Sequence, residues 1–208
     1  MANNANVPRG LIPYQHLNGA SWNGVANIYY VPSGYGTALY IGDPIVTVHA
    51  NNDANGIPCA ALAASGTAYI GSVVGIVDGG PNAAAPITVT RDLPIYHPAS
   101  TAQYILVTDS PNIVYLIQDD GSAQAAAANT WSGLNANLVS GSGSTYTGYS
   151  GWQLQASSVA VTNTLDLKIL RTLNQTDNVI GTVANTNLYA KWLVKINNYQ
   201  FANQEAGV

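Results

Sequence analysis

Short runs of β-branched and aromatic residues, each closed by a turn signal, recur along most of the chain. Ile28–Val31 ends at Pro32-Ser33-Gly34, and Gly42-Asp43-Pro44 separates Ala38–Ile41 from Ile45–His49. Such residues favour strands, and the residues between them favour tight turns. Further runs are Ala68–Val77, Ile87–Arg91, Tyr104–Thr108, Ile113–Gln118, Leu165–Leu170 and Leu188–Asn197. About nine or ten strands at this spacing predict an all-β fold, a single compact β-sandwich or barrel, with a jelly roll as one candidate topology.

Two of these runs support more detailed predictions. Ser72–Val77 is apolar on both faces, as expected of a strand that is covered on both sides. Gly71 and Gly75 lie at this run and predict a bulge, a bend or a close backbone approach, as at a barrel corner. In Lys191–Asn197 the apolar residues at every second position predict one buried face and one face that carries lysines.

The remaining organisation of the chain is simple. Residues 1–27 form a predicted extended N-terminal arm, and residues 28–208 form the β-sandwich or barrel domain. The Gly/Ser/Thr/Tyr-rich residues 140–151 are an exposed loop or a subdomain boundary. We expect at most one or two short helices, with Ser122–Asn129 as the candidate because of its alanine tract.

The predicted arm is rich in Asn, Gly and Pro and shows neither a helical nor a strand period. Ordering such a segment costs conformational entropy unless it lies on another surface. Its apolar and aromatic residues therefore predict packing on its own domain or on a partner. The candidate contact residues are Leu11, Ile12, Tyr14 and Trp22.

Charge is scarce in this sequence. Only 6 Lys and Arg and 10 Asp and Glu are present, 8% of the residues, against roughly 25% in an average protein. Asn, Ser, Thr, Gln and Gly, with 13 Tyr, supply the polar groups instead, and such a surface suits contact with other proteins. At a net charge of −4 and without a basic stripe, the chain is not expected to bind nucleic acid.

The chain offers little for cross-linking or for membrane insertion. Cys59 is the only cysteine, which excludes an intrachain disulfide and a cysteine-based metal cluster. The opening residues MANNANVPRG lack the basic and apolar regions of a secretory signal. No apolar run approaches the length of about 18 residues that a membrane helix needs. We therefore expect a soluble protein made in the cytoplasm, without a membrane partner.

No motif in the sequence points to catalysis. His16, His49 and His97 lie far apart and lack metal-ligand spacing. Glu205 is the only glutamate, so acid chemistry is left to aspartates. No nucleophile elbow, phosphate loop or zinc-protease motif occurs. We expect a protein that is not an enzyme and that has no cofactor and no metal.

Two turns superficially resemble calcium loops, Asp53-Ala54-Asn55-Gly56 and Asp119-Asp120-Gly121. Both lack the 12-residue ligand pattern of such a loop, and Asx turns are the simpler interpretation. The four Trp and 13 Tyr could form a sugar-binding platform. Packing in the core and at interfaces is the more ordinary use of these side chains.

Three stretches, taken in this order, resemble a known family. The first is Asn6-Val7-Pro8-Arg9-Gly10-Leu11 with Tyr29-Tyr30-Val31-Pro32 and Gly42-Asp43-Pro44. The second is Tyr96-His97-Pro98-Ala99-Ser100-Thr101-Ala102-Gln103-Tyr104 with Asp109-Ser110-Pro111-Asn112. The third is Gly133-Leu134-Asn135-Ala136, Gly141-Ser142-Gly143-Ser144-Thr145 and Leu165-Asp166-Leu167-Lys168-Ile169-Leu170, closing on Lys191-Trp192-Leu193-Val194-Lys195-Ile196-Asn197. Together they resemble virion structural proteins of short-tailed bacteriophages (podoviruses).

The resemblance implies a capsid cement or decoration protein. Such a protein binds the outer surface of the assembled head and bridges neighbouring subunits of the major capsid protein. A dimer or trimer of the chain is also expected, because the symmetry axes of the shell favour one. Three alternatives stay open: another virion part, such as a head fibre or a tail-associated protein; a glycan- or receptor-binding module; and an enzyme such as a depolymerase, which would need a carboxylate pair or a nucleophile in a cleft. The family supplies no catalytic residues.

Overall fold

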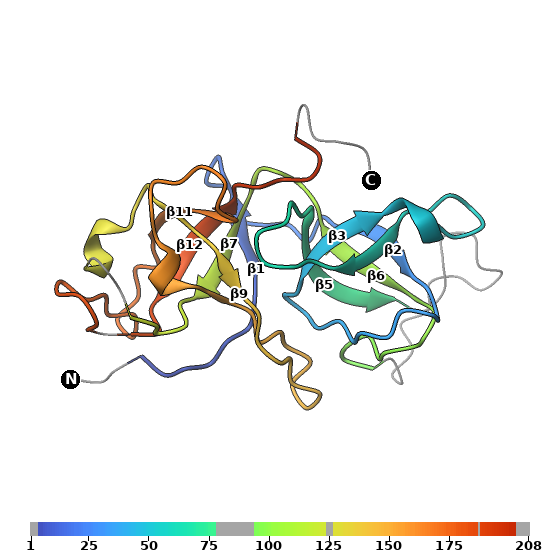
Figure 1. The fold of residues 1–208 in the computed structure, drawn as a ribbon, viewed down its shortest axis with the longest axis horizontal. Helices are drawn as coiled ribbons and strands as arrows, with labels where there is room; N and C mark the ends of the chain where they lie inside the picture. Colours follow the sequence, from blue (N-terminus) through green and yellow to red (C-terminus); the bar gives the residue numbers. More distant parts are fainter. Residues whose placement is uncertain (1–3, 78–93, 124–126, 187, 203–208) are drawn as a thin grey trace.

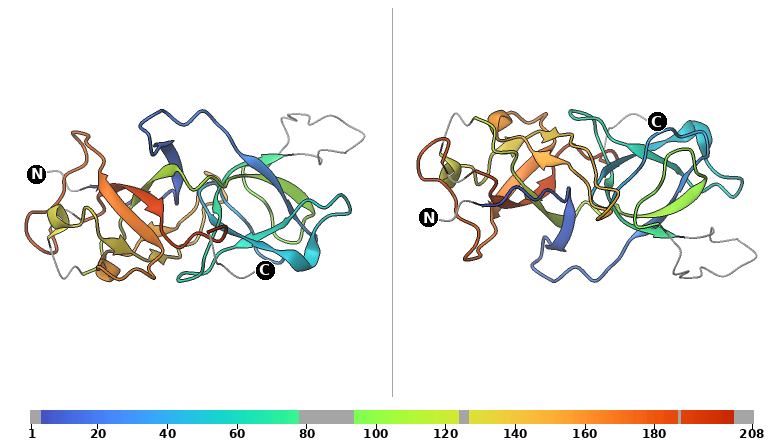
Figure 2. Two further views of the ribbon diagram at one scale, coloured as in Figure 1. Left: turned by 90° about the horizontal axis from the view of Figure 1, so that it is seen from above. Right: turned by 90° about the horizontal axis from the view of Figure 1, so that it is seen from below.

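The structure is a computed structural model that describes residues 4–77, 94–123, 127–186 and 188–202. It contains two lobes that lie side by side, a barrel and a sheet (Figures 1 and 2). The all-β prediction is confirmed, because the described part contains only strands, loops and three 3-10 turns. These turns are η1 (His49–Asn51), η2 (Ala128–Thr130) and η3 (Ala156–Ser158).

Five strands close into the barrel, in the order β2-β4-β3-β5-β6. They are β2 (Asn27–Val31), β3 (Pro44–Val48), β4 (Cys59–Leu62), β5 (Gly71–Val77) and β6 (Gln103–Thr108). The pairs are antiparallel except for β2 with β4, which meet in parallel at Tyr30 and Cys59. A five-stranded barrel of this order is simpler than a jelly roll, which needs eight strands.

Both glycine predictions for β5 are confirmed. A Cβ atom on Gly71 would lie 1.7 Å from the carbonyl oxygen of Thr108, so the two backbones touch there. The register between β5 and β6 shifts between Val73 and Gly75, which places a bulge at the second glycine. These two features bend β5 and help the sheet to close into a barrel.

The sheet lobe contains a five-stranded antiparallel sheet in the order β1-β7-β12-β11-β8. Its strands are β1 (Ile12–His16), β7 (Ile113–Gln118), β8 (Asn135–Ala136), β11 (Leu167–Thr172) and β12 (Lys191–Ile196). The short hairpin pair β9 (Leu138–Val139) and β10 (Gln153–Leu154) completes the lobe. One sheet face covers the larger hydrophobic core, in which the rings of Trp131 and Trp192 stack 5.0 Å apart.

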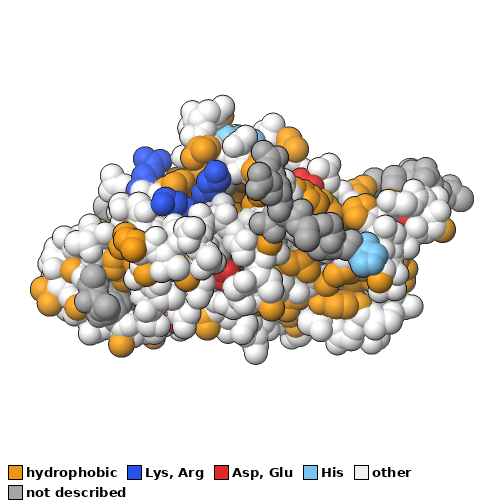
Figure 3. Space-filling view, turned by 45° about the horizontal axis from the view of Figure 1, so that its top comes forward, with side chains coloured by type: hydrophobic (Ala, Val, Ile, Leu, Met, Phe, Trp, Pro, Cys, Tyr) orange, Lys and Arg blue, Asp and Glu red, His pale blue; other side chains and the backbone are white. Residues whose placement is uncertain are grey.

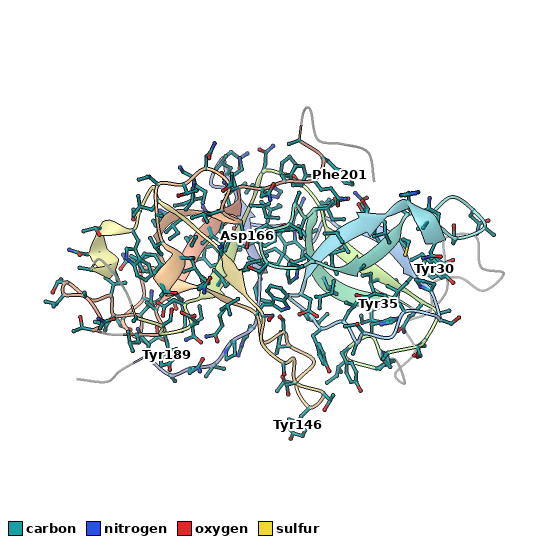
Figure 4. The ribbon with its side chains drawn as sticks, in the orientation of Figure 1. Tyr30, Tyr35, Tyr146, Asp166, Tyr189 and Phe201 are labelled. Atoms are coloured by element: carbon teal, nitrogen blue, oxygen red, sulfur yellow. The ribbon has the colours of Figure 1, made fainter. Side chains whose placement is uncertain are left out.

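The two lobes are joined through shared side chains. Tyr69 comes from the barrel but is fully buried in the core of the sheet lobe. Its hydroxyl donates to the carbonyl oxygen of Asp166 at 2.9 Å. The Asp166 carboxylate, near the middle of the molecule in Figure 4, accepts from the backbone N–H groups of Gly66 (3.0 Å) and Leu138 (2.8 Å). The lobes therefore pack on each other through buried contacts.

The chain passes from the sheet lobe to the barrel at residues 17–26, between β1 and β2, and returns at residues 109–112, between β6 and β7. Residues 140–151, the predicted loop or boundary, lie against the barrel end instead. Ile41 donates its N–H to the carbonyl oxygen of Gly148 at 2.9 Å, and Ser150 donates to the carbonyl oxygen of Ile41 at 2.9 Å. The segment is thus a loop that returns from the sheet lobe to contact the barrel.

Several predictions for individual elements need correction or lie outside the described residues. Ala38–Ile41 forms only isolated bridges, from Leu39 to His97 and from Ile41 to Tyr149. The predicted strand Ile87–Arg91 and the middle of the predicted helix Ser122–Asn129 lie outside the described residues. The end of that helix is the 3-10 turn η2.

The N-terminal segment packs on its own chain. Ile12–His16 pairs with β7 as the edge strand β1, a strand that its composition did not predict. Leu11, just before β1, is fully buried in the core of the sheet lobe. Pro13 lies within this strand, where an edge position tolerates a residue without an N–H donor.

Candidate interaction surface

Two amide side chains hold the start of the chain along the outer face of the sheet lobe. Asn4 donates to the carbonyl oxygen of Val179 at 2.8 Å and accepts from the Val179 N–H at 3.1 Å. Gln118, at the end of β7, accepts from the Val7 N–H at 2.8 Å and donates to the carbonyl oxygen of Ala5 at 2.7 Å. These bonds fix residues 4–7 as a wall above the sheet.

A groove of about 790 Å³ runs between this wall and the loop that follows β11. Leu116 of β7 and Leu173 line it from the sheet side. Val7, Tyr14 and Val179 line it as well, with 56%, 43% and 40% of their areas exposed. The groove is thus a largely apolar surface open to solvent.

Charged groups lie at the groove from three elements. The Lys191 ammonium of β12 contacts the Asp177 carboxylate at 3.1 Å, and this hydrogen bond lowers the pKa of Asp177. The Arg9 guanidinium lines the groove too and lies 5.0 Å from the centre of the Tyr149 ring. A cation over a tyrosine face is held by the ring quadrupole and still keeps its charge.

More cations lie on the same side of the sheet. Trp192, Val194 and Ile196 of β12 belong to the larger core, as predicted, so Lys191 and Lys195 project from the opposite face. Lys168 of β11 stands directly opposite Lys195 in the register of the two strands. Figure 3 shows basic side chains gathered over the sheet lobe, with hydrophobic side chains beside them.

The four predicted contact residues lie in different environments. Ile12 and Tyr14 line the groove together. Leu11 is fully buried in the core, so as a surface contact it was predicted wrongly: the strand that follows turns its side chain inward. Trp22 is half-buried and packs against the same core.

The Asx-turn interpretation of the two aspartate-rich turns is confirmed. Asp53 accepts the N–H of Asn55 at 2.9 Å, and Asp120 accepts the N–H of Ser122 at 3.0 Å. His97 is buried, and its Nε2 lies 2.8 Å from the carbonyl oxygen of Thr101. Among the described residues, no group of three or more His, Cys, Asp or Glu side chains is placed to bind a metal ion.

The tyrosines do not gather into one platform on the described surface. The rings of Tyr40 and Tyr96 stack 5.0 Å apart, whereas Tyr30 packs on Tyr104 at 5.3 Å in a separate pair. Tyr146 lies at the tip of the 140–151 loop with 92% of its area exposed, well away from Tyr30 in Figure 4.

Sequence reasoning missed the second wall of the groove and the opposition of Lys168 and Lys195. The groove lies between residues 4–10 and residues 173–179, two segments that are far apart in sequence and share no local pattern. The lysine pair depends on the register of β11 with β12, which alternation alone does not fix. The predicted lysine face of residues 191–197 was the one usable signal.

No protein-family model, curated protein or solved structure matches this chain. In the described parts of the chain, no helix is long and apolar enough to span a membrane.

Proposed function

We propose that this chain is a capsid cement protein of a short-tailed bacteriophage, which binds the outer surface of the assembled head and bridges neighbouring subunits of the major capsid protein. The observation that carries this proposal is the open apolar groove, with Tyr14 on its edge strand. Contiguous exposed apolar surface is found at contacts with proteins, membranes and ligands, and a contact with a protein supports the cement role. The resemblance in sequence order to phage virion proteins supports the same assignment.

The aspartates that are buried in the molecule support a structural role. Asp166 binds backbone N–H groups from both lobes, and Asp43 accepts the N–H of Tyr40 at 2.8 Å. Asp119 likewise accepts backbone N–H groups, including that of Ala190 at 2.9 Å. Carboxylates used in this way stabilise loops and leave few lone pairs for other chemistry.

The two-lobed shape supports the proposed bridging role. A molecule with two lobes can contact two neighbouring capsid subunits, and the second contact then forms at a high effective concentration. The binding energy stabilises the shell only after the lattice has assembled. Low charge reduces repulsion between many copies on one head, and copies that meet at a symmetry axis would form the dimer or trimer.

The experiment is co-sedimentation of the purified protein with expanded heads of the phage that encodes it. We expect the full chain to sediment with the heads, and Tyr14→Ala to weaken this binding about tenfold, as for an aromatic anchor. Tyr146→Ala is the matched control, because this tyrosine is exposed at a loop tip and does not line the groove. A full chain that stays in the supernatant contradicts the proposal.

A glycan- or receptor-binding module is the second candidate. The observation that favours it is Tyr146, whose exposed ring at a loop tip could stack on a sugar. A glycan array distinguishes the two functions: specific binding that Tyr146→Ala abolishes supports the module.

A further inference from the structure

Basic residues are distributed unevenly over this molecule. All the Lys and Arg residues in the described part of the chain belong to the sheet lobe or line its groove. They are Arg9, Lys168, Arg171, Lys191 and Lys195. Four of them lie on the neighbouring strands β11 and β12. One face of a chain with a net charge of −4 is thus basic.

The arrangement of these cations is unfavourable for the isolated chain. Lys168 and Lys195 are directly opposite each other on antiparallel strands, where like charges destabilise a sheet. Within the described residues, the only salt bridge joins Lys191 to Asp177, so Lys168 and Lys195 have no carboxylate of their own there. Opposed lysines without a counter-charge are expected where a partner supplies the negative groups.

The surface around these cations is apolar. Arg171 stands opposite Leu193, and Leu193 packs with Leu116 and Leu170 in a small cluster on this face of the sheet. Leu116 also lines the groove between the N-terminal wall and residues 173–179. The basic face therefore continues into the groove, and it combines positive charge with places for apolar side chains.

We propose that this basic face and groove bind an acidic polypeptide segment that carries apolar side chains. The Asp and Glu residues of the segment pair with Lys168, Arg171 and Lys195, and its apolar residues enter the groove beside Tyr14. Identifying the segment as part of the major capsid protein rests on the proposed function; binding of an acidic segment does not.

A polypeptide fits these observations better than a nucleic acid does. Non-specific nucleic-acid binding is driven by phosphate contacts and needs many cations, whereas this chain has only 6 Lys and Arg against 10 Asp and Glu. Leu116, Leu173 and Val179 line the groove and match aliphatic side chains, and Tyr14 is the one aromatic residue among the described lining residues, whereas single strands stack successive bases on several aromatic rings.

The test uses the full chain and a labelled peptide. The probe is a 12-residue peptide that repeats Glu-Leu-Glu-Gly, and its control repeats Gln-Leu-Gln-Gly. Fluorescence anisotropy at low salt measures the two affinities. We expect the Glu peptide to bind more tightly, with an affinity that falls as salt rises. Equal affinity for the two peptides overturns the proposal, and so does tighter binding of a single-stranded oligonucleotide.

Two matched variants locate the binding site. Lys168→Gln/Arg171→Gln/Lys195→Gln removes three positive charges from the basic face. Ser33→Asp/Thr37→Asp/Asn51→Asp lowers the net charge by the same amount at exposed positions on the barrel lobe. We expect the first variant to bind the Glu peptide about tenfold more weakly and the second to bind nearly as the unsubstituted chain does. Equal losses in both variants overturn the proposal.

Stability and head binding separate this inference from the proposed function. Because the opposed lysines repel each other, we expect the first variant to unfold at the same or a higher urea concentration; a clear loss would show that the cations are structural and overturn the inference. On heads, unchanged binding by this variant overturns the identification of the acidic segment as part of the major capsid protein. If the unsubstituted chain fails to bind heads but binds the Glu peptide, the proposed function fails and the inference stands.

Discussion

At the scale of single residues, buried carboxylates organise the loops of the sheet lobe. The fully buried Asp119 accepts hydrogen bonds from the backbone N–H groups of Gly121, Tyr189 and Ala190 and from the indole of Trp192, at 2.7 to 3.2 Å. Burial raises the pKa of Asp119, while these donors act in the opposite direction. One side chain thus connects the end of β7 to the start of β12.

Asp119→Ala should destabilise the fold strongly. It leaves several buried donors without an acceptor, which costs about 3 kcal/mol or more. Urea unfolding followed by tryptophan fluorescence measures the change. Asp177→Ala is the control, because this carboxylate is exposed and its substitution should leave the unfolding midpoint nearly unchanged. Similar midpoints for the two variants would contradict this account of Asp119.

Asp43 should make stability depend on pH. Burial raises its pKa from 3.8 to about 6, against the effect of hydrogen bonds from Ser150 and from the Tyr40 N–H. The fold therefore binds this proton more tightly than the unfolded chain does. The stability it contributes is fully present below about pH 4 and is lost as the pH rises through 6, on the order of 3 kcal/mol in total.

Comparison with Asp43→Asn isolates this effect, because the amide does not titrate. Between pH 4 and pH 7, the unfolding free energy of the unsubstituted chain should fall relative to that of the variant. Urea titrations at pH 4, 5, 6 and 7 measure the difference. A difference that stays constant over this range would show that Asp43 keeps an ordinary pKa in the fold.

At the scale of elements, closure of the barrel depends on glycine. A Cβ atom at Gly71 would overlap the carbonyl oxygen of Thr108, whereas one at Gly75 would meet the Leu106 side chain at 3.3 Å. The Leu106 side chain can move aside for a new methyl group, whereas the Thr108 backbone cannot move without disturbing the sheet. We expect Gly71→Ala to cost roughly 3 kcal/mol or more and Gly75→Ala about 1 kcal/mol. Chemical unfolding of both variants checks this order, and the reverse order would refute it.

The N-terminal segment should behave as part of the fold. Leu11→Ala creates a cavity in the core of the sheet lobe and should cost roughly 2–5 kcal/mol. Leu17→Ala is the matched control in the same segment, since Leu17 is 49% exposed. Thermal unfolding of the two variants gives the comparison. If Leu11→Ala is as stable as Leu17→Ala, the segment does not anchor the lobe.

The sequence predicted those elements whose own residues carry a strong pattern. Ile113–Gln118 and Lys191–Ile196 are strands because their apolar residues fit a pleated, buried surface. Strand β1 was missed, because Pro13 and the surrounding Asn and Gly residues hide its pairing with β7. Ala38–Ile41 was predicted as a strand, but it makes only isolated bridges.

The candidate site was less predictable than the fold. The apolar and aromatic residues near the N-terminus suggested Ile12 and Tyr14 as contact residues, and both line the groove. Leu11 belongs to the same apolar run but points into the core, a difference that only the register of β1 decides. The groove itself arises from segments that meet in space, so no local pattern could reveal it.

At the scale of the whole molecule, two lobes share buried contacts but differ in surface chemistry. The barrel lobe has no Lys or Arg among its described residues, whereas the sheet lobe carries the basic face and the groove. Tyr69 and Asp166 couple the lobes through a direct hydrogen bond. These packed, buried contacts hold the lobes together, which the proposed bridging role requires.

The copy number of this chain per virion tests the central claim most directly. Quantitative mass spectrometry of purified particles compares it with the major capsid protein. A cement protein predicts one copy, or a simple fraction of a copy, per capsid subunit. Only a handful of copies would place the chain at the tail or portal, and its absence from the particle would contradict a structural role in the virion.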